Sequence, residues 1–229
     1  MSTIAILQSN YLPWKGYFDL IDSVDTFVIY DIVQYTKNDW RNRNRIKTPT
    51  GSRWITVPVR HLHLGQPIDE VEVADRGVLC KHWMTITQNY RKAAGFREMK
   101  PVLEPLFDRE SPELLSDLNV DLLRAFTDLL GIDTEILSAA DFTLGEDRNE
   151  RLVEICDQAG ASRYLSGPAA RSYLDEPLFE EAGIDVAWMD YEGYPEYDQP
   201  HPPFDHYVSI VDLVLSAGSS SADLIRKKR

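Results

Sequence analysis

The sequence contains few cysteines and no apolar run that is long enough to cross a membrane. Among 229 residues only Cys80 and Cys156 are cysteines, and they form no CxxC pair. This excludes a disulfide framework and indicates a reducing compartment. The N-terminal apolar stretch is too short for a signal peptide and has no basic segment in front of it. No other stretch approaches the roughly 20 residues of a membrane helix. We therefore expect a cytoplasmic protein without membrane insertion.

Several common catalytic and metal-binding motifs are also missing. The chain has no G-x-S-x-G elbow, no P-loop and no G-x-G-x-x-G turn. His61 and His63 are spaced to share one face of a strand, but no third ligand lies at a telling spacing, so we expect no metal site. Cys156 lies in an apolar helical stretch, where a buried thiol is expected rather than a nucleophile.

The charge is strongly negative overall and positive in one place. The formal net charge is −13, which argues against nucleic acid or an anionic membrane as the partner. Residues 34–60 are the exception, because seven Lys or Arg residues stand there against one acid, Asp39. Such a basic segment in an acidic protein predicts a local field directed at an anionic small molecule.

Within this segment, residues 40–45 read W-R-N-R-N-R. If the chain is extended there, the arginines share one face and the asparagines the other. The planar guanidinium group suits bidentate binding of phosphate or carboxylate. We predict an anion clamp for a nucleotide, a nucleotide-sugar or a phosphorylated metabolite, made by Arg41, Arg43, Arg45 and Lys47. The alternative is that these side chains pair with acids from elsewhere on the surface.

The pattern of apolar residues predicts an α/β fold: a Rossmann-like, mostly parallel sheet flanked by helices. Short apolar runs predict strands at 3–7, 26–30, 54–59, 135–137, 163–165 and 185–189. Pro58 favours an edge or bulge for the third of them. Spacings of three and four residues predict helices at 14–23, 78–93, 96–107, 112–130, 149–159 and 206–217. We expect one domain over 1–218, with a helical insertion at about 77–131, and a flexible basic tail at 219–229.

Polar side chains follow several of these predicted strands. In open parallel sheets, ligands bind beyond the carboxyl ends of the strands, near the point where the strand order reverses. That rule selects Gln8, Asn10, Asp31, Ser166 and Gly167 as site candidates, with Asp31 as a catalytic candidate. The same residue types are also ordinary turn formers, so a purely structural role stays open.

A proline-rich stretch near the C-terminus carries aromatic and imidazole side chains. Tyr191 and Tyr194 are candidates for a pocket wall or lid. His201 and His206 flank this wall and are the acid/base candidates. A packed loop that is held together by its own aromatic rings explains the pattern equally well.

The stretch 8–18, Q-S-N-Y-L-P-W-K-G-Y-F, resembles the opening block of the WbqC-like family. The likeness continues through 31–35, 40–47, 164–168, 173–174 and 208–213 and so covers nearly the whole chain. Ser9 departs from the family pattern, which usually has proline there. Further substrate-binding candidates in these blocks are Tyr11, Trp14, Gln34, Tyr35 and Trp40.

The resemblance implies a role in O-antigen or other surface-polysaccharide biosynthesis. Our leading hypothesis is a transferase that tailors an anionic, nucleotide-linked or phosphorylated sugar, by acyl or aminoacyl transfer to an amino sugar. One alternative is a nucleotidylyltransferase or ligase that needs Mg²⁺ near Asp31. The other is a non-catalytic binding module of a polysaccharide-synthesis complex. The sequence leaves open whether the chain forms a homo-oligomer.

Overall fold

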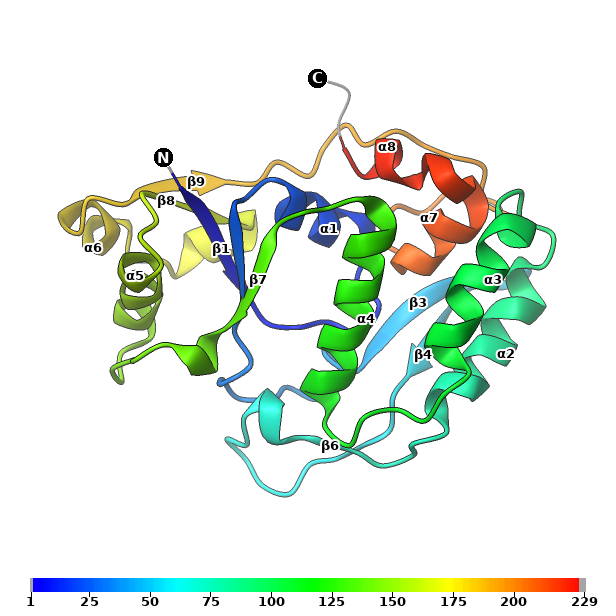
Figure 1. The fold of residues 1–229 in the computed structure, drawn as a ribbon, viewed down its shortest axis with the longest axis horizontal. Coiled ribbons are helices and arrows are strands. Elements are labelled where there is room, and N and C mark those ends of the chain that lie inside the picture. Colours follow the sequence, from blue (N-terminus) through cyan, green and yellow to red (C-terminus); the bar gives the residue numbers. More distant parts are fainter. Residues whose placement is uncertain (1, 227–229) are drawn as a thin grey trace.

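The computed structural model describes residues 2–226 and has a five-stranded parallel sheet at its centre (Figure 1). In spatial order the strands are β7 (Glu135–Ser138), β2 (Thr26–Ile29), β1 (Thr3–Leu7), β8 (Arg163–Ser166) and β9 (Asp185–Trp188). Every neighbouring pair is parallel. The predicted Rossmann-like α/β fold is confirmed.

The two faces of the sheet are both buried, which explains why its strands read as continuous apolar runs. Ala5 and Phe27 belong to one core, together with residues of α1 (Lys15–Asp22), α4 (Leu115–Leu130) and α7 (Ile210–Ala217). Ile4 and Val28, their neighbours in the strands, belong to a second core with α5 (Arg148–Gln158) and α6 (Glu176–Glu181). Figure 1 shows α5 and α6 on one side of the sheet, and α1, α4 and α7 on the other.

The prediction of a single strand at 54–59, at an edge of the sheet, is wrong. Instead β3 (Arg43–Thr48) and β4 (Gly51–Thr56) form a separate antiparallel hairpin. The Val57 N–H bonds to the Asn42 carbonyl, and Pro58 separates β4 from β5 (Val59–Arg60). β5 pairs with β6 (Glu72–Val73) in a second small ribbon. The basic segment is therefore a hairpin beside the sheet.

The helical region predicted at 77–131 lies between β2 and β7, after the hairpin. It contains α2 (Val78–Tyr90), α3 (Phe96–Phe107) and α4. Gly95 lies so close to the end of α7 that an added Cβ would be 2.4 Å from the Gly218 nitrogen. Short 3₁₀ helices lie at η1 (Ile68–Glu70), η2 (Ala139–Asp141), η3 (Pro168–Ser172) and η4 (Gly218–Ser220).

The C-terminal tail is more ordered than predicted. Residues 218–220 form η4, and α8 (Ser221–Ile225) follows with Ile225 fully buried. Ile225 belongs to the larger core, so burial of its apolar side chain holds a segment that looked polar and flexible in the sequence. Residues 227–229 of the predicted basic tail lie outside the described residues.

The strand order reverses at β1. The chain runs outward from β1 to β2 and β7, then returns to the other side of β1 with β8 and β9. The crevice where ligands bind in such sheets lies beyond the carboxyl ends of β1 and β8, where residues 8–10 and 166–168 follow. Among the helices of residues 2–226, none is long and apolar enough to cross a membrane.

Candidate functional site

Arg41 holds the loop that follows β1. Its Nη1 donates to the carbonyls of Gln8 (3.2 Å) and Ser9 (3.1 Å) and to Oδ1 of Asn10 (2.5 Å). Only 13% of its side chain is exposed. Arg41 therefore directs hydrogen bonds to the protein itself, and its effect on the site is to position Asn10.

Asp31 fastens the same loop to α4. One carboxylate oxygen accepts from the Ser9 N–H (2.8 Å), and the other accepts from the Ser116 hydroxyl (2.5 Å). The Asn119 amide donates to the Ser9 hydroxyl (3.0 Å) and completes a buried network. A proline at position 9 would lack the N–H that Asp31 accepts. The structure thus gives Asp31 a positioning contact at the base of the site.

The alternation in β3 separates amide from guanidinium side chains as predicted. Asn42 and Asn44 are buried, whereas Arg43 and Arg45 are partly exposed. The Asn44 amide donates to the Leu12 carbonyl (2.8 Å), so it ties the hairpin to the β1 loop. Because successive strand residues face opposite sides, the buried asparagines anchor the hairpin and leave the arginines on the outside.

The outer side of the hairpin carries two exposed indole rings. The Trp40 and Trp54 ring centroids are 5.2 Å apart, and each residue is about 40% exposed. The Arg43 guanidinium lies 4.3 Å from the Trp54 ring centroid, and that of Arg45 lies 5.9 Å away, which are cation–π distances. We call Trp40, Trp54, Arg43 and Arg45 the indole ledge.

Trp14 packs against the tyrosines of the C-terminal segment. Its ring centroid lies 5.2 Å from that of Tyr191, 5.9 Å from Tyr194 and 5.3 Å from Tyr207. The indole also lies on Gly16, where an added Cβ would be 2.3 Å from Cζ2 of Trp14. Glycine two residues after the tryptophan is thus what allows the indole to occupy this position.

Lys15 is a buried cation behind this aromatic wall. Its ammonium group donates to the Pro195 carbonyl (2.9 Å) and lies 5.2 Å from the ring centroids of Tyr194 and Tyr197 and 5.7 Å from that of Phe204. Burial lowers the pKa of Lys15 to about 8, although two nearby carboxylates oppose the shift. Lys15 therefore joins α1 to the C-terminal segment.

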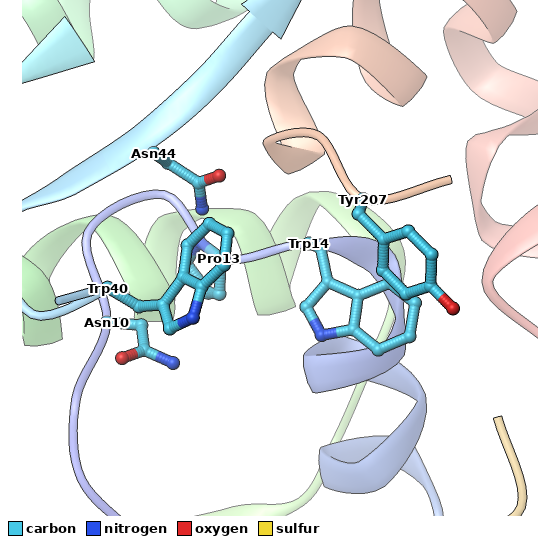
Figure 2. Close-up of a pocket in the computed structure, with 6 residues that line it drawn as sticks. All are labelled: Asn10, Pro13, Trp14, Trp40, Asn44 and Tyr207. Carbon is cyan, nitrogen blue, oxygen red and sulfur yellow. The ribbon is translucent and has the colours of Figure 1, made fainter. Parts of the chain in front are cut away.

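These elements enclose a pocket of about 220 Å³. Its lining residues are Asn10, Pro13, Trp14, Trp40, Asn44 and Tyr207. Figure 2 shows Trp14 and Tyr207 together on one side and Trp40 on the other, with Asn10 and Asn44 on either side of the Trp40 ring. The pocket therefore offers flat apolar walls and the amide of Asn10, whereas the buried amide of Asn44 is already bonded to backbone groups.

Three of the predicted site residues line this pocket, namely Asn10, Trp14 and Trp40. Tyr191 and Tyr194 lie behind it against Trp14. Gly167 lies next to Tyr191, because an added Cβ would be 3.7 Å from the tyrosine hydroxyl oxygen. Ser166, which precedes Gly167, is buried.

Other predicted binding residues are used inside the protein. Tyr11 is fully buried, with its hydroxyl 2.7 Å from Nδ1 of His82. Tyr35 is buried with its ring against His61. Gln34 is exposed and forms a backbone bridge with Pro67.

The remaining clamp candidate, Lys47, and the two base candidates, His201 and His206, also make internal contacts. The buried Lys47 ammonium donates to the Pro203 carbonyl. The His201 ring bonds to the Asn89 carbonyl (3.0 Å). His206 precedes the pocket residue Tyr207, and its ring lies 4.5 Å from that of Phe204. All four predicted clamp residues donate to backbone carbonyls, and they do not all face one spot. Arg43 and Arg45 lie on the ledge, whereas the side chains of Arg41 and Lys47 are largely buried.

Pro13, Asn44, Tyr207 and Lys15 were not predicted from the sequence. For Asn44 a signal existed, since the alternation in 40–45 predicts that it faces away from the arginines. Lys15 had a signal too, since it interrupts the apolar run of residues 11–18. A lysine at such a position is buried only when its charge finds partners.

The comparison with known proteins identifies the family. The model of the WbqC-like protein family matches residues 8–224. The chain belongs to this family. It is 47% identical to an uncharacterized protein of Mycobacterium tuberculosis over 99% of this chain and 98% of the relative. No solved structure matches the chain. The matched region of this WbqC-like protein includes every residue that lines the pocket.

The described part of the chain has no group of three or more His, Cys, Asp or Glu residues able to hold a metal ion. Asp31, the position considered for Mg²⁺, already accepts a hydrogen bond on each oxygen. The residues around Asp31 therefore do not fit a Mg²⁺ site of the usual oxygen-rich kind.

Proposed function

We propose that this WbqC-like protein is a group-transfer enzyme that modifies an anionic sugar intermediate of surface-polysaccharide biosynthesis, and that the pocket holds the sugar ring. The observation that carries the proposal is the pocket's lining of three aromatic rings and the amide of Asn10. A pyranose ring has apolar C–H faces and a rim of hydroxyl groups. Aromatic rings match the faces, and the amide nitrogen of Asn10, whose oxygen is held by Arg41, donates to the hydroxyls.

The charge next to the pocket supports an anionic substrate. Arg45 donates through Nη2 to the carbonyl of Tyr207 (2.6 Å), so its guanidinium lies at the pocket wall. Arg43 lies further along the ledge, on Trp54. These cations belong to the basic segment 34–60 of a chain whose net charge is −13, and they attract an anionic group attached to the bound ring.

His206 is the base candidate next to the pocket in the sequence, since it precedes the lining residue Tyr207. Burial, followed by the nearby charge of Lys15, lowers the pKa of His206, so that the imidazole is neutral and able to accept a proton at pH 7. In an acyl transfer to an amino sugar, the amine nitrogen attacks the acyl carbon and His206 takes the amine proton. The bond between the acyl carbon and the donor then breaks, and His206 returns the proton to the departing donor group. Asp31 acts indirectly, by holding the loop that carries Asn10.

Replacing Tyr207 with alanine tests the pocket. Tyr207 is 60% exposed, so Tyr207→Ala is expected to keep the melting temperature. We expect binding of a sugar phosphate or nucleotide-linked sugar, measured by calorimetry, to weaken about tenfold because one aromatic wall is lost. Tyr173→Ala is the matched control, since Tyr173 is 48% exposed and lies in the turn after η3. Equal affinity in the two variants would contradict the pocket assignment.

Activity assays with the same ligands distinguish the proposed transferase from the two alternative functions. Pyrophosphate release that depends on Mg²⁺ would favour a nucleotide-activating enzyme. Retained affinity with no turnover of any acyl or aminoacyl donor would favour a binding module.

A further inference from the structure

The pocket is too small to hold a whole nucleotide-linked sugar. Its volume of about 220 Å³ is below the roughly 300–1,000 Å³ of sites that enclose drug-sized ligands. A single ring fits inside, and any larger ligand must continue outside. The part of the surface that continues from the Trp40 and Tyr207 walls is the indole ledge.

Aromatic rings and positively charged guanidinium groups alternate along this surface. From the pocket wall at Tyr207 the next group is the Arg45 guanidinium, which is bonded to the Tyr207 carbonyl (2.6 Å). The Trp54 ring follows, 5.9 Å from that guanidinium, and it also contacts Trp40, the opposite pocket wall, at 5.2 Å. The ledge thus presents a cation between two aromatic positions, with a second cation, Arg43, on Trp54.

The ledge cations are only partly neutralised. The Asp205 carboxylate lies 3.7 Å from Nη2 of Arg45, which is an ion pair without hydrogen-bond contact, and both side chains remain partly exposed. Arg43 bonds to the side chain and carbonyl of Asn38, which carries no charge. An anion that arrives between the pocket and Trp54 therefore meets positive charge that is near the surface.

We propose that the indole ledge is a nucleotide subsite: Trp54 and Trp40 stack the base of a nucleoside diphosphate, while Arg45 and Arg43 contact its phosphates. This rests on the proposed function, and it narrows the substrate to a nucleoside-diphosphate sugar whose sugar occupies the pocket. Such a ligand consists of a sugar ring, an anionic diphosphate and a flat base. These three parts match the pocket, Arg45 and Trp54, in that order. A neutral oligosaccharide would supply no negative charge to either guanidinium group.

Calorimetric titration of the full chain with uridine diphosphate, adenosine diphosphate and inorganic pyrophosphate tests the subsite. Stacking of a base on an aromatic ring contributes about 1–3 kcal/mol, so Trp54→Ala should weaken the binding of both nucleotides about 5- to 150-fold. The affinity for pyrophosphate should change less than twofold, because pyrophosphate has no base. Arg45→Gln should weaken all three probes.

A second aromatic–arginine pair supplies the matched control. Trp188 of β9 and Arg171 of η3 form a cation–π contact at 5.2 Å, and neither residue lines the pocket or belongs to the ledge. Trp188→Ala should leave all three affinities unchanged. The proposal is overturned if Trp54→Ala binds the nucleotides like the unaltered protein, or if maltotriose binding depends on Trp54 while the nucleotides bind no better than pyrophosphate.

Comparing uridine diphosphate with uridine diphosphate glucose separates this inference from the proposed function. If Tyr207→Ala weakens only the glucose-bearing ligand, both stand. If uridine diphosphate depends on Trp54 but no sugar-bearing ligand depends on Tyr207, the nucleotide subsite stands and the sugar pocket fails. If the binding of sugar phosphates depends on Tyr207 but the binding of nucleotides does not depend on Trp54, the sugar pocket stands and the nucleotide subsite fails.

Discussion

At the scale of single residues, the contact between Trp14 and Gly16 determines one wall of the pocket. The indole lies where any Cβ at position 16 would be, and it is held on its other sides by Tyr191, Tyr194 and Tyr207. Helix propensity alone favours alanine over glycine in α1 by about 1 kcal/mol. The glycine is therefore explained by the space that Trp14 needs.

Gly16→Ala should move Trp14 out of the wall. Overpacking costs about 1–3 kcal/mol, which outweighs the gain in helix propensity, so we expect a lower melting temperature together with weaker ligand binding and altered tryptophan fluorescence. Gly77→Ala, where the nearest atom to an added Cβ is 3.4 Å away, is the control and should leave binding unaffected. Unchanged affinity and fluorescence in Gly16→Ala would show that Trp14 does not depend on this space.

At the scale of elements, the segment between β9 and α7 depends on side chains of other elements for its position. It contains no helix or strand from residue 189 to residue 209. Lys15 of α1 and Lys47 of β3 donate to its carbonyls, and Asp212 of α7 accepts from Tyr197 (2.8 Å). The position of Tyr207 over the pocket follows from these ties.

Lys15→Met tests the tie to α1 through pH. The pKa of Lys15 is about 8 in the folded chain against an ordinary value of 10.5, so between these values the unfolded chain binds more protons and stability rises with pH. We expect the unaltered protein to gain on the order of 1–2 kcal/mol over Lys15→Met between pH 7.5 and 9.5, measured by urea unfolding. Parallel pH profiles for the two proteins would rule out a depressed pKa at Lys15.

The elements of the sheet were predictable because their strands are covered on both faces and so read as short apolar runs. The hairpin was misread, since its register is fixed by contacts such as Asn44 with the β1 loop, which lie far apart in the sequence. The concentration of basic residues in the sequence singled out Arg43 and Arg45, which lie on the indole ledge. It could not tell that Arg41 and Lys47 bond to backbone carbonyls, because that depends on which carbonyls the fold brings near.

At the scale of the whole molecule, packing of the helical region on the β1 loop makes the protein sensitive to acid. His82 of α2 is buried, with Nδ1 2.7 Å from the Tyr11 hydroxyl. Burial lowers the pKa of His82 to about 4. The folded protein therefore keeps this imidazole neutral well below pH 6.5, while the unfolded chain takes up the proton.

Stability should accordingly fall as the pH drops from 6.5 to 4.5. The shift corresponds to a loss of about 2–3 kcal/mol over this range, which urea unfolding at each pH measures. His82→Gln retains a hydrogen-bonding group but does not titrate, so its profile should be flatter, whereas His63→Gln, an exposed site, should behave like the unaltered protein. A flat profile for the unaltered protein would contradict burial of a neutral His82.

The alternating order of asparagine and arginine in β3 has a consequence for how this protein varies in evolution. Because side chains change sides at every step of a strand, inserting or deleting one residue between 41 and 46 would bring guanidinium groups into the interior and turn the anchoring amides outward. Relatives should therefore exchange individual arginines more readily than they change the length of this stretch. Among relatives, the number of residues in this stretch should therefore vary less than its charge.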